Sequence, residues 1–99
     1  MRFSSGGPIP NGSEAINVAI EFDTDLGDIN FIVTAVKAFN KYFAIVMDIE
    51  SESVVGSTML EIDENTMAGK MTIEHYCGDF DVEVTVNGDF DRWMVNIKH

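Results

Sequence analysis

The sequence predicts an α+β domain in which one helix packs on an antiparallel meander sheet of about five or six strands. Three observations favour this fold class. Apolar and polar residues alternate in most segments, apolar spacings of three and four replace the alternation over residues 28–42, and short turns separate the segments. Short connections make neighbouring strands antiparallel, so the strands would follow one another in a meander.

The first 13 residues predict a flexible or loosely docked arm, because Gly and Pro are frequent and no period is sustained. Phe3 and Ile9 could attach this arm to the body. A single domain is expected over residues 14–99, since a chain of 99 residues can bury one core. The domain begins with a half-buried strand at residues 14–22, whose buried side would hold Ile16, Val18, Ile20 and Phe22.

Residues 28–42 form the predicted helix. Asp25 could cap its start, and Lys37 and Lys41 suit its negative end. Its apolar side would consist of Ile29, Ile32, Val33, Val36, Phe39 and Phe43. A strand is the competing interpretation, because residues 31–34 are poor helix formers and alternate residues are also apolar. That alternative leads to an all-β meander or a small barrel.

Five further strands are predicted at residues 42–50, 54–63, 70–76, 80–86 and 91–98. Asn87-Gly88 is a preferred pair for a tight hairpin turn, in which both residues take positive φ. A loop of two or four residues there places even-numbered residues of one strand and odd-numbered residues of the next on the same face. The shorter loop also pairs Glu83 with Arg92. In both registers Phe80 lies in the core and Phe90 at the surface.

The chain is strongly acidic, with 17 Asp and Glu against six Lys and Arg and a formal net charge of −11. Such a charge repels nucleic acid and anionic membranes and attracts basic protein surfaces. Direct binding to nucleic acid or to a membrane is therefore not expected. A single cysteine and the lack of an apolar segment long enough to cross a bilayer favour a cytoplasmic protein.

Neither an enzyme nor a metal or cofactor site is expected. His75 and Cys77 lie two residues apart, but a zinc site needs about four such ligands. Side chains two apart on a strand are separated by about 7 Å, too far for His75 to activate the thiol. The acidic segment at residues 23–28 lacks the glycine and the glutamate that a calcium loop requires at its sixth and twelfth positions.

The acidic residues suggest the function. Asp48, Glu50 and Glu52 occupy every second position, as do Asp81 and Glu83, so on strands each set would form a row of carboxylates about 7 Å apart. This spacing is comparable to that of phosphates along a nucleic acid. The predicted partner-binding surface also includes Phe90, Arg92 and Met94, with the two apolar side chains as anchors. Solvation of one sheet face would explain the same acids without a partner.

We therefore expect a small non-enzymatic binding protein, an inhibitor or immunity-type neutraliser of a basic or nucleic-acid-handling protein. It would act by charge complementarity, with nucleic-acid mimicry as one form of it. No family motif stands out, and small acidic phage-encoded inhibitors of host defence resemble the chain only in size and charge. The competing expectation is a structural or assembly subunit that forms a homo-oligomer through its sheet.

Overall fold

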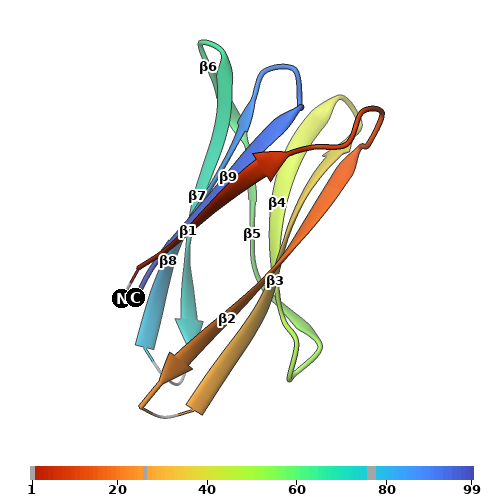
Figure 1. Cartoon of the computed structure of the whole chain (residues 1–99). Coiled ribbons are helices and arrows are strands. Elements are labelled where there is room, and N and C mark those ends of the chain that lie inside the picture. The colour runs from red at the N-terminus through yellow and green to blue at the C-terminus, as the bar shows by residue number, and fades with distance from the viewer. Residues whose placement is uncertain (1, 26, 76–77) are drawn as a thin grey trace.

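The chain folds into two antiparallel sheets packed face to face, an all-β sandwich (Figure 1). The computed structural model describes residues 2–25, 27–75 and 78–99, and these residues contain no helix. Sheet A has the order β1 (Arg2–Pro8), β9 (Arg92–Lys98), β8 (Gly78–Asn87), β7 (Thr66–His75), β6 (Glu61–Asp63). Sheet B has the order β2 (Ala15–Thr24), β3 (Gly27–Ala38), β4 (Lys41–Asp48), β5 (Ser53–Met59). The α+β prediction is wrong, and its all-β alternative is confirmed.

The segment predicted as a helix is a hairpin of β3 and β4. Phe39 and Asn40 lie between the two strands with φ of 53° and 61°. Positive φ at both central residues is typical of a tight hairpin turn and is incompatible with a right-handed helix. The helical pattern counted Phe39 as buried, whereas its side chain is 96% exposed. The competing alternation is correct, because the inner face of β3 carries Ile29, Phe31, Val33 and Ala35.

The segment expected to be an arm contains β1, which pairs with β9 and so joins the two ends of the chain. Phe3 packs against the core and Ile9 is buried within it. The β1–β9 pair also has a close backbone contact, since a Cβ added to Gly6 would lie 2.9 Å from the Trp93 carbonyl oxygen. Frequent glycine and proline hide the period of this edge strand in the sequence.

The β8–β9 connection differs from both predicted registers. Val86 pairs with Trp93 and Val84 with Val95, so the pairing is displaced by two residues from the longer predicted loop. Neither Asn87 nor Gly88 has positive φ, and the Asn87 side chain instead accepts hydrogen bonds from the backbone N–H groups of Asp91 and Arg92, each at 2.9 Å. A displacement by two preserves the alternation, so the predicted inner face of β8 is confirmed.

Both sheets contribute to one hydrophobic core. Phe31 of β3 and Phe80 of β8 meet edge to face, with ring centroids 5.5 Å apart. The sheets approach closely where β5 passes β7, because a Cβ on Gly69 would lie 2.6 Å from Cγ2 of Thr58. The chain crosses from sheet B to sheet A between β5 and β6, at the buried Leu60.

Strand directions give the sandwich two distinct ends. β2, β4 and β7 finish at the end drawn lowest in Figure 1, and β3, β5 and β8 start there. The opposite end holds the β3–β4, β6–β7 and β8–β9 connections. Within the described residues, no helix is long and apolar enough to cross a membrane.

Candidate functional site

Carboxylates from both sheets gather at the end of the sandwich where β2, β4 and β7 finish. We call this group the acidic end, and all its side chains are exposed. It contains no Lys or Arg, although Arg2 and Lys98 lie nearby on the first and last strands. The members of the acidic end are Glu21, Asp23, Asp25, Asp28, Glu50, Glu52, Glu74 and Asp79.

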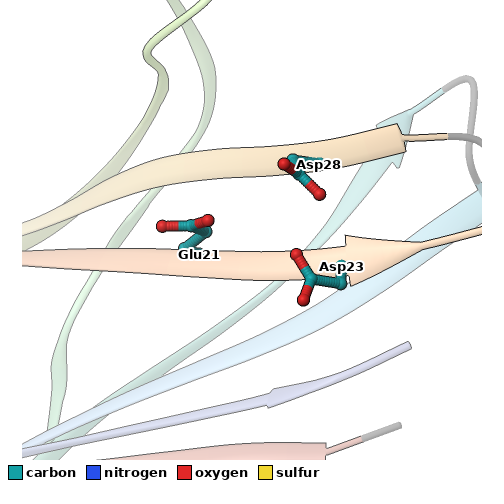
Figure 2. Close-up of side chains that lie close together, drawn as sticks. All are labelled: Glu21, Asp23 and Asp28. Atoms are coloured by element: carbon teal, nitrogen blue, oxygen red, sulfur yellow. The ribbon is translucent and has the colours of Figure 1, made fainter.

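Three members of the acidic end are in close proximity. Asp23 of β2 is directly opposite Asp28 of β3, and Figure 2 shows Glu21 beside them. Carboxylate oxygens of the three lie within 4.8 Å of one another. A hydrogen bond with Asp23 and the Asp23 charge raise the pKa of Asp28 above its ordinary 3.8, with smaller effects from desolvation, Glu21 and Glu50. The hydrogen bond and the neighbouring negative charges thus all oppose ionisation of Asp28.

The same three carboxylates could offer hard oxygen ligands to a cation such as Ca²⁺. Calcium takes six to eight oxygens in proteins, and exposed acidic groups commonly cluster without an ion. Among the described residues, this is the one group of three or more acidic, His or Cys side chains whose ligand atoms all lie within 4.8 Å of one another. The cluster is therefore better described as a concentration of negative charge than as a metal centre.

The predicted row of Asp48, Glu50 and Glu52 does not form, because β4 ends at Asp48. Asp48 lies on the inner side of sheet B, where its Oδ2 is 3.7 Å from Nε2 of His75 and its side chain is 13% exposed. Its Oδ1 also accepts a hydrogen bond from the backbone N–H of Glu50, at 3.0 Å. Glu50 and Glu52 are exposed in the turn before β5. Only these two of the three face solvent.

Asp81 and Glu83 share the outer face of sheet A, as their spacing predicts, but basic residues accompany them there. Glu83 Oε2 lies 3.5 Å from Lys70 Nζ, and Asp81 is opposite Lys98 in the β8–β9 register. Asp81 also accepts a hydrogen bond from the Thr72 hydroxyl at 3.0 Å. A shallow hollow of about 890 Å³ lies over this region, lined by side chains of both charges. The outer face of sheet A is thus charge-balanced.

Of the three remaining predicted contact residues, Arg92 and Met94 share the outer face of sheet A with Asp81 and Glu83, as predicted, whereas Phe90 does not. Phe90 is only 8% exposed, and its ring packs against Tyr42 with centroids 5.2 Å apart, so its prediction as a surface anchor is wrong. The β8–β9 loop turns Phe90 inward with a φ of 55°. Met94 is 48% exposed on the outer face of sheet A, and Arg92 is opposite Pro8 of β1 instead of Glu83.

The His75 and Cys77 pair is only partly described, because Cys77 lies outside the described residues. The side chain of His75 is only 9% exposed and forms edge-to-face contacts with the rings of Phe31 and Phe80, at centroid distances of 6.0 and 6.2 Å. Together with Asp48, these rings hold the imidazole between the two sheets. This environment is typical of a histidine that contributes to packing.

The sequence interpretation missed the outer face of sheet B. On β3, β4 and β5, inward-facing residues alternate with outward-facing ones, many of which are also apolar. Residues 43–47 are apolar without interruption, and such runs are typical of strands covered on both faces. This run was a usable signal that the outer face of sheet B differs from a solvated one. The larger apolar residues on this face are Ile32, Val36, Phe43, Ile45, Met47, Val54 and Met59.

No known protein family, curated protein or solved structure is significantly similar to this chain. Two surfaces of the sandwich are the basis from which function can be inferred: the acidic end and the apolar outer face of sheet B.

Proposed function

We propose that the chain is a small non-enzymatic binding protein that captures a basic protein surface at its acidic end. The observation that carries this proposal is that eight exposed carboxylates, from strands and turns of both sheets, lie at one end of the sandwich with no Lys or Arg among them. The like charges of Glu21, Asp23 and Asp28, whose carboxylate oxygens lie within 4.8 Å of one another, reduce the stability of the free protein. A cationic partner would neutralise these charges, so the relief of repulsion would add to the free energy of binding.

The proposed partner is a protein whose surface presents clustered Lys or Arg. Nucleic-acid-handling proteins form one such class, because they bind phosphates with these side chains. The chain would then act as an inhibitor or neutraliser, covering the basic surface by charge complementarity and steric occlusion. A regular imitation of the phosphate backbone is not part of this proposal, because Asp48 faces His75 instead of extending a row. We place this interaction in the cytoplasm, in keeping with the single cysteine.

The test is capture of partners from a cell extract at low salt and at about 0.5 M salt, where screening acts within a few ångströms. We expect the main partner to be recovered at low salt and lost at high salt. Reversal of the acidic end, Glu50→Lys with Glu52→Lys, should then weaken the affinity for that partner by about tenfold or more in a calorimetric titration.

A matched control is available at the opposite end of the sandwich. Glu61→Lys with Glu64→Lys makes the same change in net charge, and Glu64 and Glu52 are both exposed turn residues with positive φ, at 55° and 53°. The control should leave most of the affinity intact. Equal losses for the two variants would mean that only total charge matters, and capture insensitive to salt would overturn the proposal.

A further inference from the structure

The outer face of sheet B is apolar although nothing in the described chain covers it. Met47, Val54 and Met59 are 37%, 58% and 44% exposed, and Ile49 at the end of β4 is 42% exposed. Ile32 and Val36 of β3, with Phe43 and Ile45 of β4, lie half-buried between them. Monomeric soluble proteins rarely leave a contiguous apolar surface of this kind in water, and such surfaces mark interaction sites.

Cross-strand register makes the face continuous. Phe43 is opposite Val36 on one side and Met59 on the other, which gives one apolar row. Met47 is likewise opposite Ile32 and Val54, which gives a second row. Ile45 lies between the two rows on the same strand, opposite Thr34 and Ser57. The face therefore has two apolar rows arranged on either side of a central, more polar row.

We propose that a second copy of this chain covers the outer face of sheet B, in a two-fold symmetric dimer with the facing strands antiparallel. Two-fold symmetry makes an interface self-complementary, so each apolar row must meet a suitable row of the other copy. Rotation about an axis near Ile45 places the Phe43 and Met59 row of one copy over the Met47 and Val54 row of the other. Antiparallel sheets at about 10 Å separation are an ordinary packing of β-structure.

Charge determines this orientation. Glu21 and Asp28 lie beyond the Met47 row, whereas Lys41 lies beyond the Phe43 row, on the same outer face. Parallel packing would bring two acidic ends together. Antiparallel packing places the acidic ends at opposite poles, separated by a distance comparable to the 39 Å length of the molecule and several times the Debye length of about 8 Å. It also places Lys41 of each copy near carboxylates of the other.

The available area suits a reversible dimer. Four strands at about 4.8 Å spacing and about eight residues at 3.3 Å give a footprint on the order of 500 Å² per copy. Two copies would thus bury roughly 1,000 Å² in total, which is the lower limit for a specific interface. We therefore expect association in the micromolar range, supplied by apolar contacts. The dimer leaves much of the acidic end uncovered, so it is compatible with the proposed function and does not depend on it.

The experiment is sedimentation of the full chain over a range of concentrations from micromolar to near-millimolar. We expect a monomer–dimer equilibrium that persists or strengthens when salt is added, because salt screens the repulsion between two chains of net charge −11. Capture of a basic partner should respond to salt in the opposite direction. A chain that is monomeric at every concentration overturns the dimer and leaves the capture test unaffected.

Substitutions locate the interface. Met47→Lys and Val54→Lys should each weaken the dimer by about tenfold or more, since each places an unpaired charge in an apolar contact. Lysine lowers the net negative charge, so weaker association could not come from greater repulsion. Ile62→Lys and Met94→Lys make the same change at apolar positions that are 77% and 48% exposed outside this face, and they should leave the dimer intact.

Met47→Leu keeps an apolar side chain of similar size and should preserve the association. Cooperative thermal unfolding of each variant verifies that it is folded. A dimer that survives Met47→Lys and Val54→Lys but is lost with Met94→Lys would move the interface to sheet A and overturn the proposal.

Discussion

The outer faces of the two sheets differ in the polarity of their side chains although both belong to one sandwich. Along β8 of sheet A, buried Val82 and Val84 alternate with outward Asp81 and Glu83, which is the pattern of a sheet with one face in water. Along β4 of sheet B, the residues on both sides of the strand are apolar. The difference indicates that the outer face of sheet A is suited to contact with water, whereas the outer face of sheet B is suited to contact with protein.

The distribution of charge reinforces this contrast. Four of the six basic residues, Arg2, Lys70, Arg92 and Lys98, point outward from sheet A, where they accompany its acids. On the outer face of sheet B, Glu21, Asp23 and Asp28 lie together with no basic residue among them, and a hydrogen bond with Asp23 and the Asp23 charge raise the pKa of Asp28. Exposed apolar side chains beside unpaired charges lower the stability of the free monomer. This combination is what interaction surfaces require, namely apolar contact area with a charged rim.

The largest loss in the free energy of unfolding should come from a substitution in the core between the two sheets. Phe80→Ala removes a ring that is fully buried against Phe31 and should lower the free energy of unfolding by about 3–5 kcal/mol. Met94→Ala, on the outer face of sheet A, should change it by no more than about 0.5 kcal/mol. Urea denaturation of the two variants measures both values. Similar losses would mean that Met94 is also covered, and the contrast between inner and outer faces would fail.

A smaller loss in the free energy of unfolding should follow from filling a place where the two sheets approach closely. Gly69→Ala adds a Cβ that would lie 2.6 Å from Thr58 Cγ2 and 2.8 Å from Leu60 Cδ2. The neighbours must shift, and overpacking of this kind costs about 1–3 kcal/mol. Gly12→Ala is a control without overpacking. The added Cβ has no atom within 4 Å, so only the φ of 83°, which alanine rarely adopts, opposes the substitution. Full stability in Gly69→Ala would show that β5 and β7 are less tightly packed than the structure indicates.

Alternation was the sequence feature that predicted structure best, because it is a local consequence of the strand geometry. It identified the inner face of β8 even though the predicted loop was wrong, since a displacement by two residues leaves every side chain on its own face. It also identified the inner face of β3 as the competing interpretation of the predicted helix. Helical spacing fitted the same residues because an apolar run satisfies both periods.

Features that depend on long-range contacts were not predictable. The pairing of β1 with β9 joins residues at opposite ends of the chain, and the chain passes from sheet B to sheet A at Leu60, within the single strand that alternation predicted over residues 54–63. The inward position of Phe90 depends on the Asn87 side chain capping the β8–β9 loop instead of forming the expected turn. Of the predicted contact residues, the structure exposes Glu50 and Glu52 but turns Asp48 and Phe90 inward.

A small change in the free energy of unfolding is expected when the ion pair on the charge-balanced outer face of sheet A is removed. Glu83→Gln removes the partner of Lys70, whose Nζ lies 3.5 Å from Glu83 Oε2. The two side chains are 80% and 36% exposed, so water screens the pair and the free energy of unfolding should fall by about 0.2–1 kcal/mol. The loss should shrink when salt is added. An increase in stability would mean that the acids of sheet A are as poorly compensated as those of the acidic end.

The smallest effect should have the opposite sign, at the acidic end. Asp28→Asn removes one charge from its repulsion with Asp23 and Glu21 and keeps an amide that can still bond to Asp23, so the variant should unfold at a slightly higher temperature at neutral pH. The control, Asp63→Asn, removes the same charge at the opposite end of the sandwich. If both variants gain equally, the benefit comes from net charge alone and the acidic end is not distinctive.

The dependence of this effect on pH follows from the direction of the pKa shift. Because the folded pKa of Asp28 lies above the ordinary 3.8, the folded state binds its proton more tightly than the unfolded state does. The contribution of Asp28 to stability is therefore most favourable at low pH and is lost as the pH rises through the folded pKa. The thermal advantage of Asp28→Asn over the natural chain should accordingly be present at neutral pH and disappear in acid. An advantage that stays constant with pH would show that crowding of carboxylates at the acidic end does not destabilise the free protein.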